Sequence, residues 1–285
     1  MIAYTVSAQA LSGLGGGLDV PHLLFCKKNA SFQEVVEITD PAYWDSYWST
    51  SDKPKLRDND PHYGRHGYFL KAMIRHLGEL TGKSIVELGG AMSYKLIAFA
   101  KFKQMQATAI DYAPDAVEKS KKFYAAHGVE IELDCADLFS PVLDDRKFDV
   151  VSHWGVVEHF EDPLSVLKRS VDLCAAGGKI IFDMPQMRGP VGWLWKTFSP
   201  GRWEQHVYHT DENIERCFKS LGWQCKRAFW GVPVVYMIPG QNSGAVPFML
   251  HGCQYLLHHA ARLGVPYQYG FPYVSSSRGF VAWKV

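Results

Sequence analysis

A carboxylate and two glycines stand close together in the first third of the chain, at Glu87, Gly89 and Gly90. Residues 84–88 form a short apolar run with β-branched side chains, which predicts a strand, and the apolar pattern over 94–103 predicts a helix. Glycines in the turn between them permit backbone angles that other residues avoid, and the first turn of a helix offers unpaired N–H groups. The combination predicts a turn that cradles a ligand of the nucleotide type.

The charge of Glu87 narrows the choice of ligand. A cradle for pyrophosphate carries Gly-x-Gly-x-x-Gly or ends in Lys-Ser/Thr, and a carboxylate pointing into it would repel the phosphates. Ala91 and Met92 follow the two glycines, so neither fingerprint is complete. A carboxylate here favours a ligand with a positive end, such as S-adenosylmethionine, which carries a sulfonium and an ammonium group. An ordinary strand-to-helix turn without a ligand is the alternative that this stretch alone leaves open.

At this point the chain resembles the class I S-adenosylmethionine-dependent methyltransferases, whose first motif reads acid-x-Gly-x-Gly-x-Gly. Glu87 and Gly89 match the motif, whereas Ala91 and Ser93 stand in place of its later glycines. The resemblance implies that Glu87, Gly89, Gly90 and Ala91 contact the cofactor.

A second strand-turn-helix unit follows the first. A strand is predicted over 107–110 and ends on Asp111, and Pro114 begins a helix predicted over 115–127. A carboxylate at the end of the second strand can accept both ribose hydroxyls of an adenosine, whether that of NAD or of S-adenosylmethionine. A carboxylate that caps the helix is the alternative. The resemblance implies that Tyr112 lies beside the cofactor as well.

The segment after a third predicted strand, 129–133, resembles the part of these enzymes that reads the adenine ring. The resemblance implies that Asp137 accepts a hydrogen bond from the adenine amino group and that Leu138 lies beside the ring. Farther upstream, Tyr63 and Arg65 are candidates for contacting the cofactor carboxylate, as residues near this point do in the family.

The stretch after a fully apolar strand, 148–152, is the most specific part of the sequence. It resembles the fourth-strand motif of small-molecule methyltransferases related to the quinone-ring methylating enzymes. Four residues match that motif position by position: Glu158, His159, Asp162 and Pro163. The resemblance implies that His153 and Trp154 contact the cofactor. A helix to residue 173, a Gly-Gly turn and a strand over 180–183 follow in the family's order.

The same loop argues against two other kinds of methyl transfer. Methylation of amino groups on DNA bases uses an Asn/Asp-Pro-Pro-aromatic run, which is absent from the sequence at 152–155. Metal-dependent catechol methylation binds magnesium through a carboxylate cluster that includes Asp-Asn, and that pair is absent too. Glu158 and Glu161 are expected to be solvated, and the histidines and cysteines lack the spacing of zinc ligands. No metal is therefore predicted.

The excursion over 184–209 lies where the resembled family builds a roof over its substrate. Aromatic residues that favour a planar or partly apolar acceptor are predicted to form the substrate pocket: Trp44, Trp154, Trp193, Trp195, Trp203 and Tyr208. A hydroxyl acceptor must lose a proton, and histidine titrates in the right pH range to take it. His206, next to the roof, is the first candidate for the base, followed by His159 and His153. Packing or hydrogen-bonding roles are the alternatives for all three.

The predicted architecture is an α/β fold with a Rossmann-like, seven-stranded, mostly parallel sheet and helices on both faces. Residues 64–238 are predicted to form its core, with a sixth strand within 225–235. Residues 239–285 hold an insertion and the last strand, 280–284, which is expected as an edge-type partner.

Residues 1–63 are predicted to form an N-terminal arm and lid. Four aromatic residues share one face of a helix there by their spacing: Tyr43, Trp44, Tyr47 and Trp48. The resemblance favours a lid over the ligand, and simple packing of this helix onto the core is the alternative.

The composition limits the kinds of partner that the protein is expected to bind and indicates where it is located. Lys and Arg number 30 and Asp and Glu 29, so no overall field attracts nucleic acid or an anionic membrane. No apolar run reaches the roughly 20 residues that span a bilayer, and the N-terminus has no secretory or transit signature. Six cysteines without a Cys-x-x-Cys pair predict reduced thiols and a cytoplasmic location. The expected partner is a small molecule, and the insertion over 239–277 is a candidate for a homodimer contact or an extra pocket wall.

Together these patterns predict a methyltransferase that uses S-adenosylmethionine and acts on a small, partly aromatic or apolar metabolite, most readily at oxygen. Open alternatives on the same fold are methylation at nitrogen or carbon, methylation of a protein side chain, and a non-catalytic partner subunit that binds the cofactor. Ala91 and Ser93, in place of glycines, keep the last alternative open.

Overall fold

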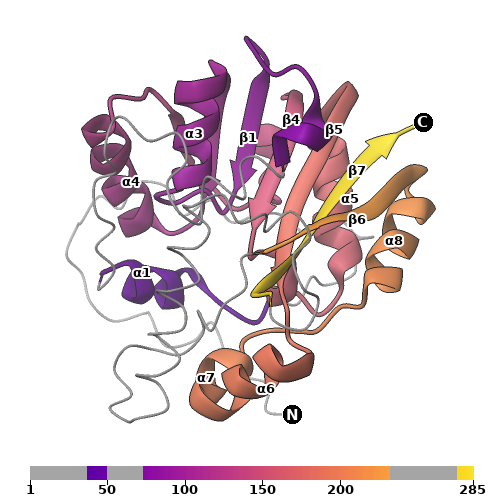
Figure 1. Cartoon of the computed structure of the whole chain (residues 1–285). Helices are drawn as coiled ribbons and strands as arrows, with labels where there is room; N and C mark the ends of the chain where they lie inside the picture. Colours follow the sequence, from indigo (N-terminus) through magenta and orange to yellow (C-terminus); the bar gives the residue numbers. More distant parts are fainter. Residues whose placement is uncertain (1–36, 50–72, 232–274) are drawn as a thin grey trace, which may run out of the picture. The chain divides into compact units, whose positions relative to one another are not determined.

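A single sheet organises the protein. The computed structural model describes residues 37–49, 73–231 and 275–285 (Figure 1). Within these ranges seven strands pair in the order β3-β2-β1-β4-β5-β7-β6. Their bounds are β1 Ser84–Leu88, β2 Gln106–Asp111, β3 Glu132–Cys135, β4 Phe148–Trp154, β5 Cys174–Pro185, β6 Trp223–Trp230 and β7 Ser277–Lys284. The predicted seven-stranded Rossmann-like sheet is confirmed.

Most of the sheet is parallel. β1 pairs in parallel with β2 and β4, β2 with β3, and β4 with β5, whereas β7 runs antiparallel to both β5 and β6. The expectation that residues 280–284 form an edge-type strand is wrong. Phe280 lies opposite Phe182 on one side and Arg227 on the other, so β7 is an interior strand and is almost wholly buried.

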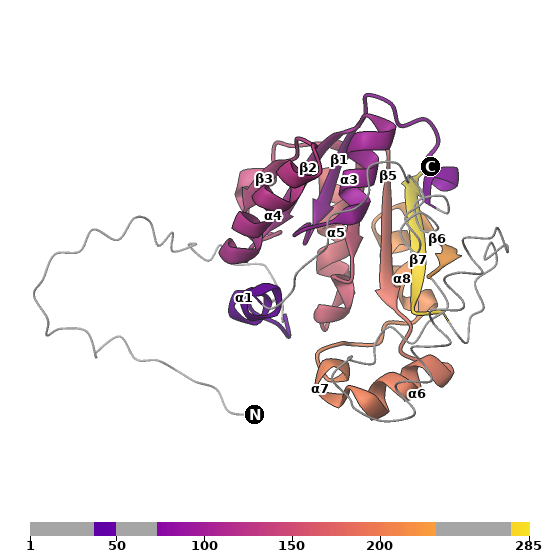
Figure 2. The same ribbon diagram turned by 60° about the vertical axis from the view of Figure 1, so that its left-hand side comes forward.

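Helices cover both faces of the sheet. α3 Tyr94–Lys103 and α4 Pro114–Ala126 lie on one face, and α5 Pro163–Leu173 and α8 Asp211–Ser220 on the other (Figure 2). Local sequence explains where these helices begin. Ser93, Asp162 and Thr210 cap α3, α5 and α8 with their side-chain oxygens, and proline is the first residue of α4 and α5.

Two apolar cores form because neighbouring residues of a strand point to opposite faces. Ile85 belongs to the core under α3 and α4, whereas Val86 belongs to the core under α5 and α8. Ile181 and Phe182 divide in the same way on β5. The sheet is thus buried on both sides, as its long apolar strands require.

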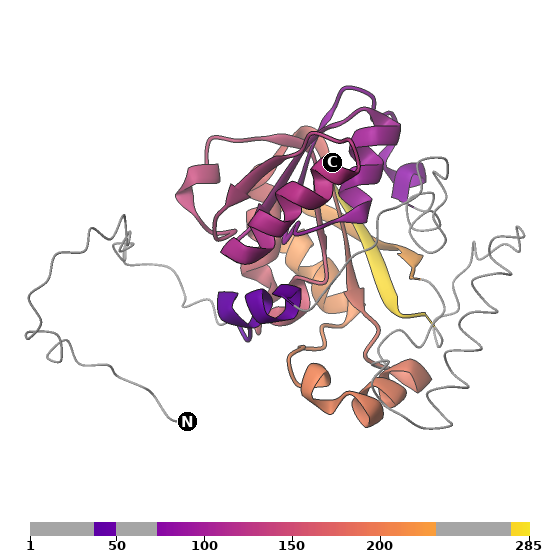
Figure 3. The same ribbon diagram turned by 90° about the vertical axis from the view of Figure 1, so that its left-hand side faces the viewer.

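Three further helices gather at one end of the sheet. α1 Pro41–Ser49, α6 Gly189–Phe198 and α7 Pro200–Trp203 lie beyond the carboxyl ends of the parallel strands (Figure 3). Strand order reverses between β1 and β4, and open α/β sheets bind ligands in the crevice at such a point. The chain therefore brings α1 and the α6–α7 excursion to the edge where a ligand is expected.

Element bounds agree with the sequence patterns where these are strong. α3 has the predicted bounds, whereas β3 begins three residues later than the predicted strand at 129. Residues 73–77 form a helical segment ahead of β1. The arm before residue 37 and the insertion over 239–274 also lie outside them. Among the helices described, none is long and apolar enough to cross a membrane.

Candidate active site

A pocket opens at the carboxyl ends of β1, β2 and β4, beside α1. Its empty space, including the part open to solvent, is about 690 Å³, within the range of small-molecule sites. The lining residues come from the segment before α1 and α1 itself, from the first three strand ends and from the loop after β4: Glu37, Trp44, Trp48, Gly89, Ile110, Asp111, Tyr112, Ala136, Asp137, Leu138, Trp154, Gly155, Val156, His159 and Phe160.

The glycine turn at the end of β1 is tightly packed. Gly89 has a φ of +68°, and a Cβ there would lie 3.0 Å from the Cγ2 of Val156. At Gly90 a Cβ would lie 2.8 Å from the Cβ of Ala109. The positive φ of Gly89 and the close approach of Ala109 to Gly90 therefore favour glycine at both positions, and only Gly89 lines the pocket.

The amides of this turn bond within the chain, which differs from the expected cradle of unpaired N–H groups. Gly89 and Gly90 both donate to the carbonyl oxygen of Ile110, at 2.8 and 3.0 Å. The next three amides, of residues 91–93, donate to side-chain oxygens on α4 and at the end of β2. A turn whose donors are occupied does not suit a phosphate, in agreement with its incomplete phosphate fingerprint.

Glu87 lies beneath the turn rather than along the pocket wall. It is 3% exposed, and its Oε2 accepts a 2.8 Å hydrogen bond from the hydroxyl of Ser93. Ser93 also accepts from the amide of Leu96 and so begins α3. Ser93, which replaces a family glycine, therefore ties Glu87 to the helix start. Direct contact of Glu87, Gly90 and Ala91 with a cofactor stays a prediction.

Asp111 lines the pocket at the end of β2. Its Oδ2 accepts from the amide of Ala91 at 3.2 Å and its Oδ1 from the amide of Ala113 at 3.1 Å. Burial raises the pKa of this carboxyl to about 6, although the two amides act in the opposite direction. Ala113 is the residue before α4, so Asp111 supports the helix start and faces the pocket at the same time.

Residues 136–138 line the pocket next to Asp111. Asp137 is exposed, and its Oδ1 accepts a 2.7 Å hydrogen bond from the amide of Phe139. Arg169 on α5 holds the same loop, because its guanidinium donates to the carbonyl oxygens of Leu138 and Ser140 at 2.7 Å each. The predicted adenine-reading segment thus has a buried anchor.

α1 covers the pocket and is held by several bonds. The Tyr112 hydroxyl donates to Glu37 at 2.7 Å, and the amide of Asp115 donates to Asp45 at 3.1 Å. Trp44 and Trp48 face the pocket from α1. Sequence reasoning missed Glu37, since its position depends on an antiparallel bridge to Phe160, whereas the helical spacing of Trp48 to Trp44 places it on the aromatic face of the expected lid.

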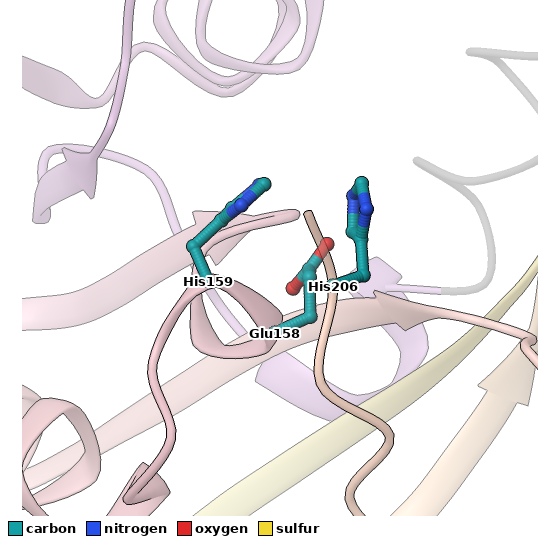
Figure 4. Close-up of side chains that lie close together, drawn as sticks. All are labelled: Glu158, His159 and His206. Atoms are coloured by element: carbon teal, nitrogen blue, oxygen red, sulfur yellow. The ribbon is translucent and has the colours of Figure 1, made fainter. Parts of the chain in front are cut away.

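Glu158, His159 and His206 form a cluster beside the pocket. Glu158 and His159 belong to the short 3-10 helix η2, Val157–His159, and His206 follows α7. Figure 4 shows the Glu158 carboxylate between the two imidazole rings, whose centroids are 4.6 Å apart. One possible ligand atom from each residue lies within 4.8 Å of the other two. His159 also lines the pocket, so the cluster borders it.

Glu158 and His159 are buried and His206 is half-buried, which changes the protonation of all three. Glu158 is 3% exposed, so the expectation that it is solvated is wrong, whereas Glu161 is exposed as expected. Burial raises the pKa of Glu158 to about 8 and lowers the pKa of His159 to about 3. Burial also lowers the pKa of His206. Both histidines are therefore neutral at pH 7.

His153 and Trp154 are adjacent on β4 but point to opposite faces of the sheet. Trp154 lines the pocket, and the ammonium of Lys95 lies 3.9 Å from its ring centre. His153 is fully buried in the other core, stacked on Phe182, and neither of its ring nitrogens has a hydrogen-bond partner among the described residues. Burial lowers its pKa to about 3. Its predicted roles at the site stay predictions.

The roof aromatics lie outside the pocket lining. Trp193 is 65% exposed, whereas Trp195 is buried and packs against both Trp203 and His206. The guanidinium groups of Arg188 and Arg278 lie 4.3 and 4.9 Å from the ring centre of Tyr208. Contact of these residues with a substrate stays a prediction. Tyr63 and Arg65 lie outside the described residues.

Comparison with known proteins identifies a family and distant relatives. A family model described as "Methyltransferase domain" matches residues 62–227. The ubiquinone biosynthesis O-methyltransferase of Coxiella burnetii is 23% identical over 157 residues, which are 55% of this chain. The match covers 63% of that relative's length, so the chain spans less than two thirds of the curated relatives it matches.

Solved structures share the fold at low sequence identity. The magnesium protoporphyrin IX methyltransferase of Synechocystis, solved with bound S-adenosylmethionine, has a TM-score of 0.53 and 13% identity, covering 90% of this chain and 100% of its own. A plantazolicin methyltransferase, solved with S-adenosylhomocysteine and a substrate analogue, has a TM-score of 0.52 and 17% identity, covering 86% and 96%. Because the family model matches more than half of the sequence, the chain belongs to the methyltransferase-domain family.

Proposed function

We propose that the protein transfers a methyl group from S-adenosylmethionine to a small-molecule acceptor, at an oxygen atom of a partly aromatic or apolar metabolite. The observation that carries this proposal is one pocket, at the switch point of the sheet, that is lined by both Asp111 and His159. A carboxylate at the end of the second strand suits an adenosine, and a neutral histidine suits a hydroxyl acceptor.

The pocket walls fit the cofactor in chemical type. Asp111 would accept hydrogen bonds from the ribose hydroxyls, while Asp137 and Leu138 would contact the adenine. Gly89 leaves room that a Cβ would fill, and the indole N–H of Trp154 is buried without a hydrogen-bond partner among the described residues. Aromatic faces also attract cations, so Trp154 and the tryptophans of α1 suit a sulfonium.

Methyl transfer is an in-line displacement that depends on alignment and exclusion of water. The bound cofactor supplies an activated methyl group. A lone pair of the acceptor oxygen forms the new C–O bond, the S–C bond breaks with its electron pair going to sulfur, and the hydroxyl proton is released. The chain must therefore hold the acceptor in a dry pocket and provide a lone pair that accepts the proton.

The two histidines of the cluster offer such lone pairs. His159 Nδ1 lies 3.0 Å from the carbonyl oxygen of Gln205, and His206 Nδ1 lies 2.5 Å from that of Arg202. A carbonyl oxygen can only accept, so each Nδ1 carries the hydrogen and each neutral ring has its lone pair on Nε2. His159 lines the pocket, which favours it over His206 as the group that touches the acceptor.

Oxygen as the acceptor atom is supported by the relative whose name specifies O-methylation. The apolar character of the acceptor is supported by Trp44, Trp154 and Phe160 in the lining. We further propose that α1 acts as a lid, because it covers the pocket through polar bonds that can open, and that residues 184–209 form the acceptor's roof.

The test has a binding arm and a turnover arm. Titration calorimetry with S-adenosylhomocysteine should give micromolar affinity, and NAD should not bind. Turnover is measured with S-adenosylmethionine that carries a deuterated methyl group, against matched panels of phenols, catechols and arylamines, with product detected by mass spectrometry. Label on phenol or catechol oxygen supports the proposal, and label confined to arylamines refutes the acceptor atom. Cofactor binding without any turnover would favour the partner-subunit alternative.

A further inference from the structure

Three metal-binding side chains converge where the pocket borders the α7 excursion. Glu158, His159 and His206 approach one another within 4.8 Å, although His206 is distant from the other two in sequence. In Figure 4 the two rings and the carboxylate project to the same side of their backbone segments. Two imidazoles with one carboxylate are a recurrent donor set for divalent transition metals.

The histidines are already oriented as metal ligands usually are. Metal-binding histidines commonly donate one ring N–H to a carbonyl or carboxylate, which fixes the ring and leaves the other nitrogen for the metal. His159 and His206 both donate Nδ1–H to backbone carbonyls, of Gln205 and Arg202. Their Nε2 lone pairs are therefore available to a cation.

Glu158 supplies an independent observation. Its carboxyl is 3% exposed, and its Oε2 has no hydrogen-bond partner in the part of the chain that the structure describes. Leaving a buried carboxyl oxygen unpaired costs about 1–3 kcal/mol, more if it is charged. Gly155 makes room for the same side chain, because a Cβ at Gly155 would lie 3.2 Å from Glu158 Oε1. The fold thus accommodates a buried acceptor that lacks its partner.

We propose that Glu158, His159 and His206 bind one divalent transition ion of the zinc class. Imidazole nitrogens favour zinc and its neighbours over magnesium and calcium, which prefer oxygen ligands. Bonds of about 2.0–2.2 Å to three ligands of a tetrahedral ion would bring the ligand atoms to about 3.4 Å from one another. The present separation of up to 4.8 Å must therefore contract by side-chain rotation when the ion binds.

Three protein ligands leave at least one position of the ion for another oxygen. His159 lines the pocket, so an ion bound to it would border the place of the acceptor. This part of the inference rests on the proposed function. With the ion bound, both Nε2 lone pairs would be taken up by it, so the hydroxyl of a bound acceptor would lose its proton to solvent rather than to His159, and its oxygen would then attack the methyl carbon. The substrate class is accordingly a phenol, enol or similar hydroxyl whose acidity a metal can raise.

The first test measures metal binding without the methyl donor. Chelator-treated protein is titrated with Zn²⁺ by calorimetry and with Co²⁺ by visible absorption, which reports nitrogen and oxygen ligands in a low-coordinate site. One equivalent should bind, and Mg²⁺ should bind at least 100-fold more weakly. Glu158→Gln and His206→Gln should each weaken Zn²⁺ binding 100-fold or more.

His127→Gln is the matched control. His127 is also buried, with its Nδ1 bonded to a backbone carbonyl, but its ring contacts Tyr94 and Phe123 rather than any member of the cluster. It should leave Zn²⁺ affinity unchanged. Glu158→Gln keeps the size of the side chain, and circular dichroism with thermal unfolding checks that each variant is folded. Failure of the intact protein to bind, or equal binding by folded cluster variants, would overturn the metal site.

The second test separates the metal role from the proposed function. Chelation should abolish turnover, Zn²⁺ or Co²⁺ should restore it, and affinity for S-adenosylhomocysteine should stay within twofold. Full turnover by metal-free protein would refute the role of the ion at the acceptor. If the intact, metal-loaded protein does not bind S-adenosylhomocysteine, the proposed function is refuted. The zinc titration still tests the metal site in that case, because it measures Zn²⁺ binding without the methyl donor.

Discussion

Replacement of Asp111 by asparagine should weaken binding of S-adenosylhomocysteine by about 100-fold. The carboxylate is 8% exposed, so its hydrogen bonds are little screened by solvent. Hydrogen bonds to a charged group contribute about 1.5–3 kcal/mol each, and two ribose hydroxyls at the lower figure give about 3 kcal/mol. Each 1.4 kcal/mol corresponds to about tenfold in affinity, which yields the stated loss.

The pH dependence of S-adenosylhomocysteine affinity tests the same assignment of Asp111 in a second way. Burial raises the pKa of Asp111 to about 6, and the ionised form is the one that accepts both hydroxyls. Affinity of the unmodified protein should be constant above about pH 7 and fall about tenfold for each unit below the pKa. Asp111→Asn should lack this fall, because its amide does not titrate in that range.

Calorimetry at a series of pH values measures both effects. The matched control is Asp134→Asn, on the neighbouring strand β3, whose carboxylate pairs with Arg146 and does not line the pocket. Thermal unfolding must show that Asp111→Asn is folded, since its side chain also accepts from the amides of Ala91 and Ala113. Equal affinity in a folded Asp111→Asn variant would refute the assignment of this carboxylate to the ribose.

Three further substitutions test the structure around the site. His153→Leu removes unpaired ring nitrogens and should raise the free energy of unfolding by about 1–3 kcal/mol at neutral pH, measured by urea unfolding. Burial lowers the pKa of His153 to about 3, so protons bind the unfolded state first as pH falls from about 6.5, and the advantage of the leucine variant should grow by up to about 1.4 kcal/mol per pH unit. Gly90→Ala should lower the free energy of unfolding by about 1–3 kcal/mol in the same assay, because its Cβ would overlap Ala109, and an unchanged value would contradict the packing described. Arg169→Met should lower the free energy of unfolding by about 2 kcal/mol. It should also weaken S-adenosylhomocysteine binding, because Arg169 holds the carbonyl of Leu138 in the pocket lining.

The cofactor end of the pocket could be predicted because its signals are local. A short apolar run, a glycine turn and a capped helix specify β1 and α3 within a few residues, and the predicted bounds of both agree with the structure. The position of Asp111 could be predicted in the same way, because the apolar pattern of β2 shows where that strand ends. Its place on the pocket wall then follows from the parallel pairing of β1 and β2.

The remaining features depend on contacts between distant segments. The burial of Glu158 comes from the segment that follows α7, whose residue Val207 donates its amide to the Glu158 carbonyl. No local pattern reports such a contact, so the sequence predicted a solvated carboxylate and no metal. The interior position of β7 is equally nonlocal, because it is decided by pairing with β5 and β6. For His153 and Trp154 the pattern could not decide which face of β4 meets the pocket.

The cofactor end of the pocket is positioned by local sequence, whereas the acceptor end depends on contacts between distant segments, and this difference affects how the protein selects its acceptor. An unbroken series of ring contacts joins α1 to α6 across the cluster: Trp44 to His159 at 5.1 Å, His159 to His206 at 4.6 Å, and His206 to Trp195 at 4.8 Å. Movement of α1 or of the α6–α7 excursion therefore displaces the histidines directly, whereas the Asp111 end is held by the sheet. We expect substitutions in α6, which does not line the pocket, to change acceptor turnover and metal affinity together, while affinity for S-adenosylhomocysteine follows the strand ends and α1.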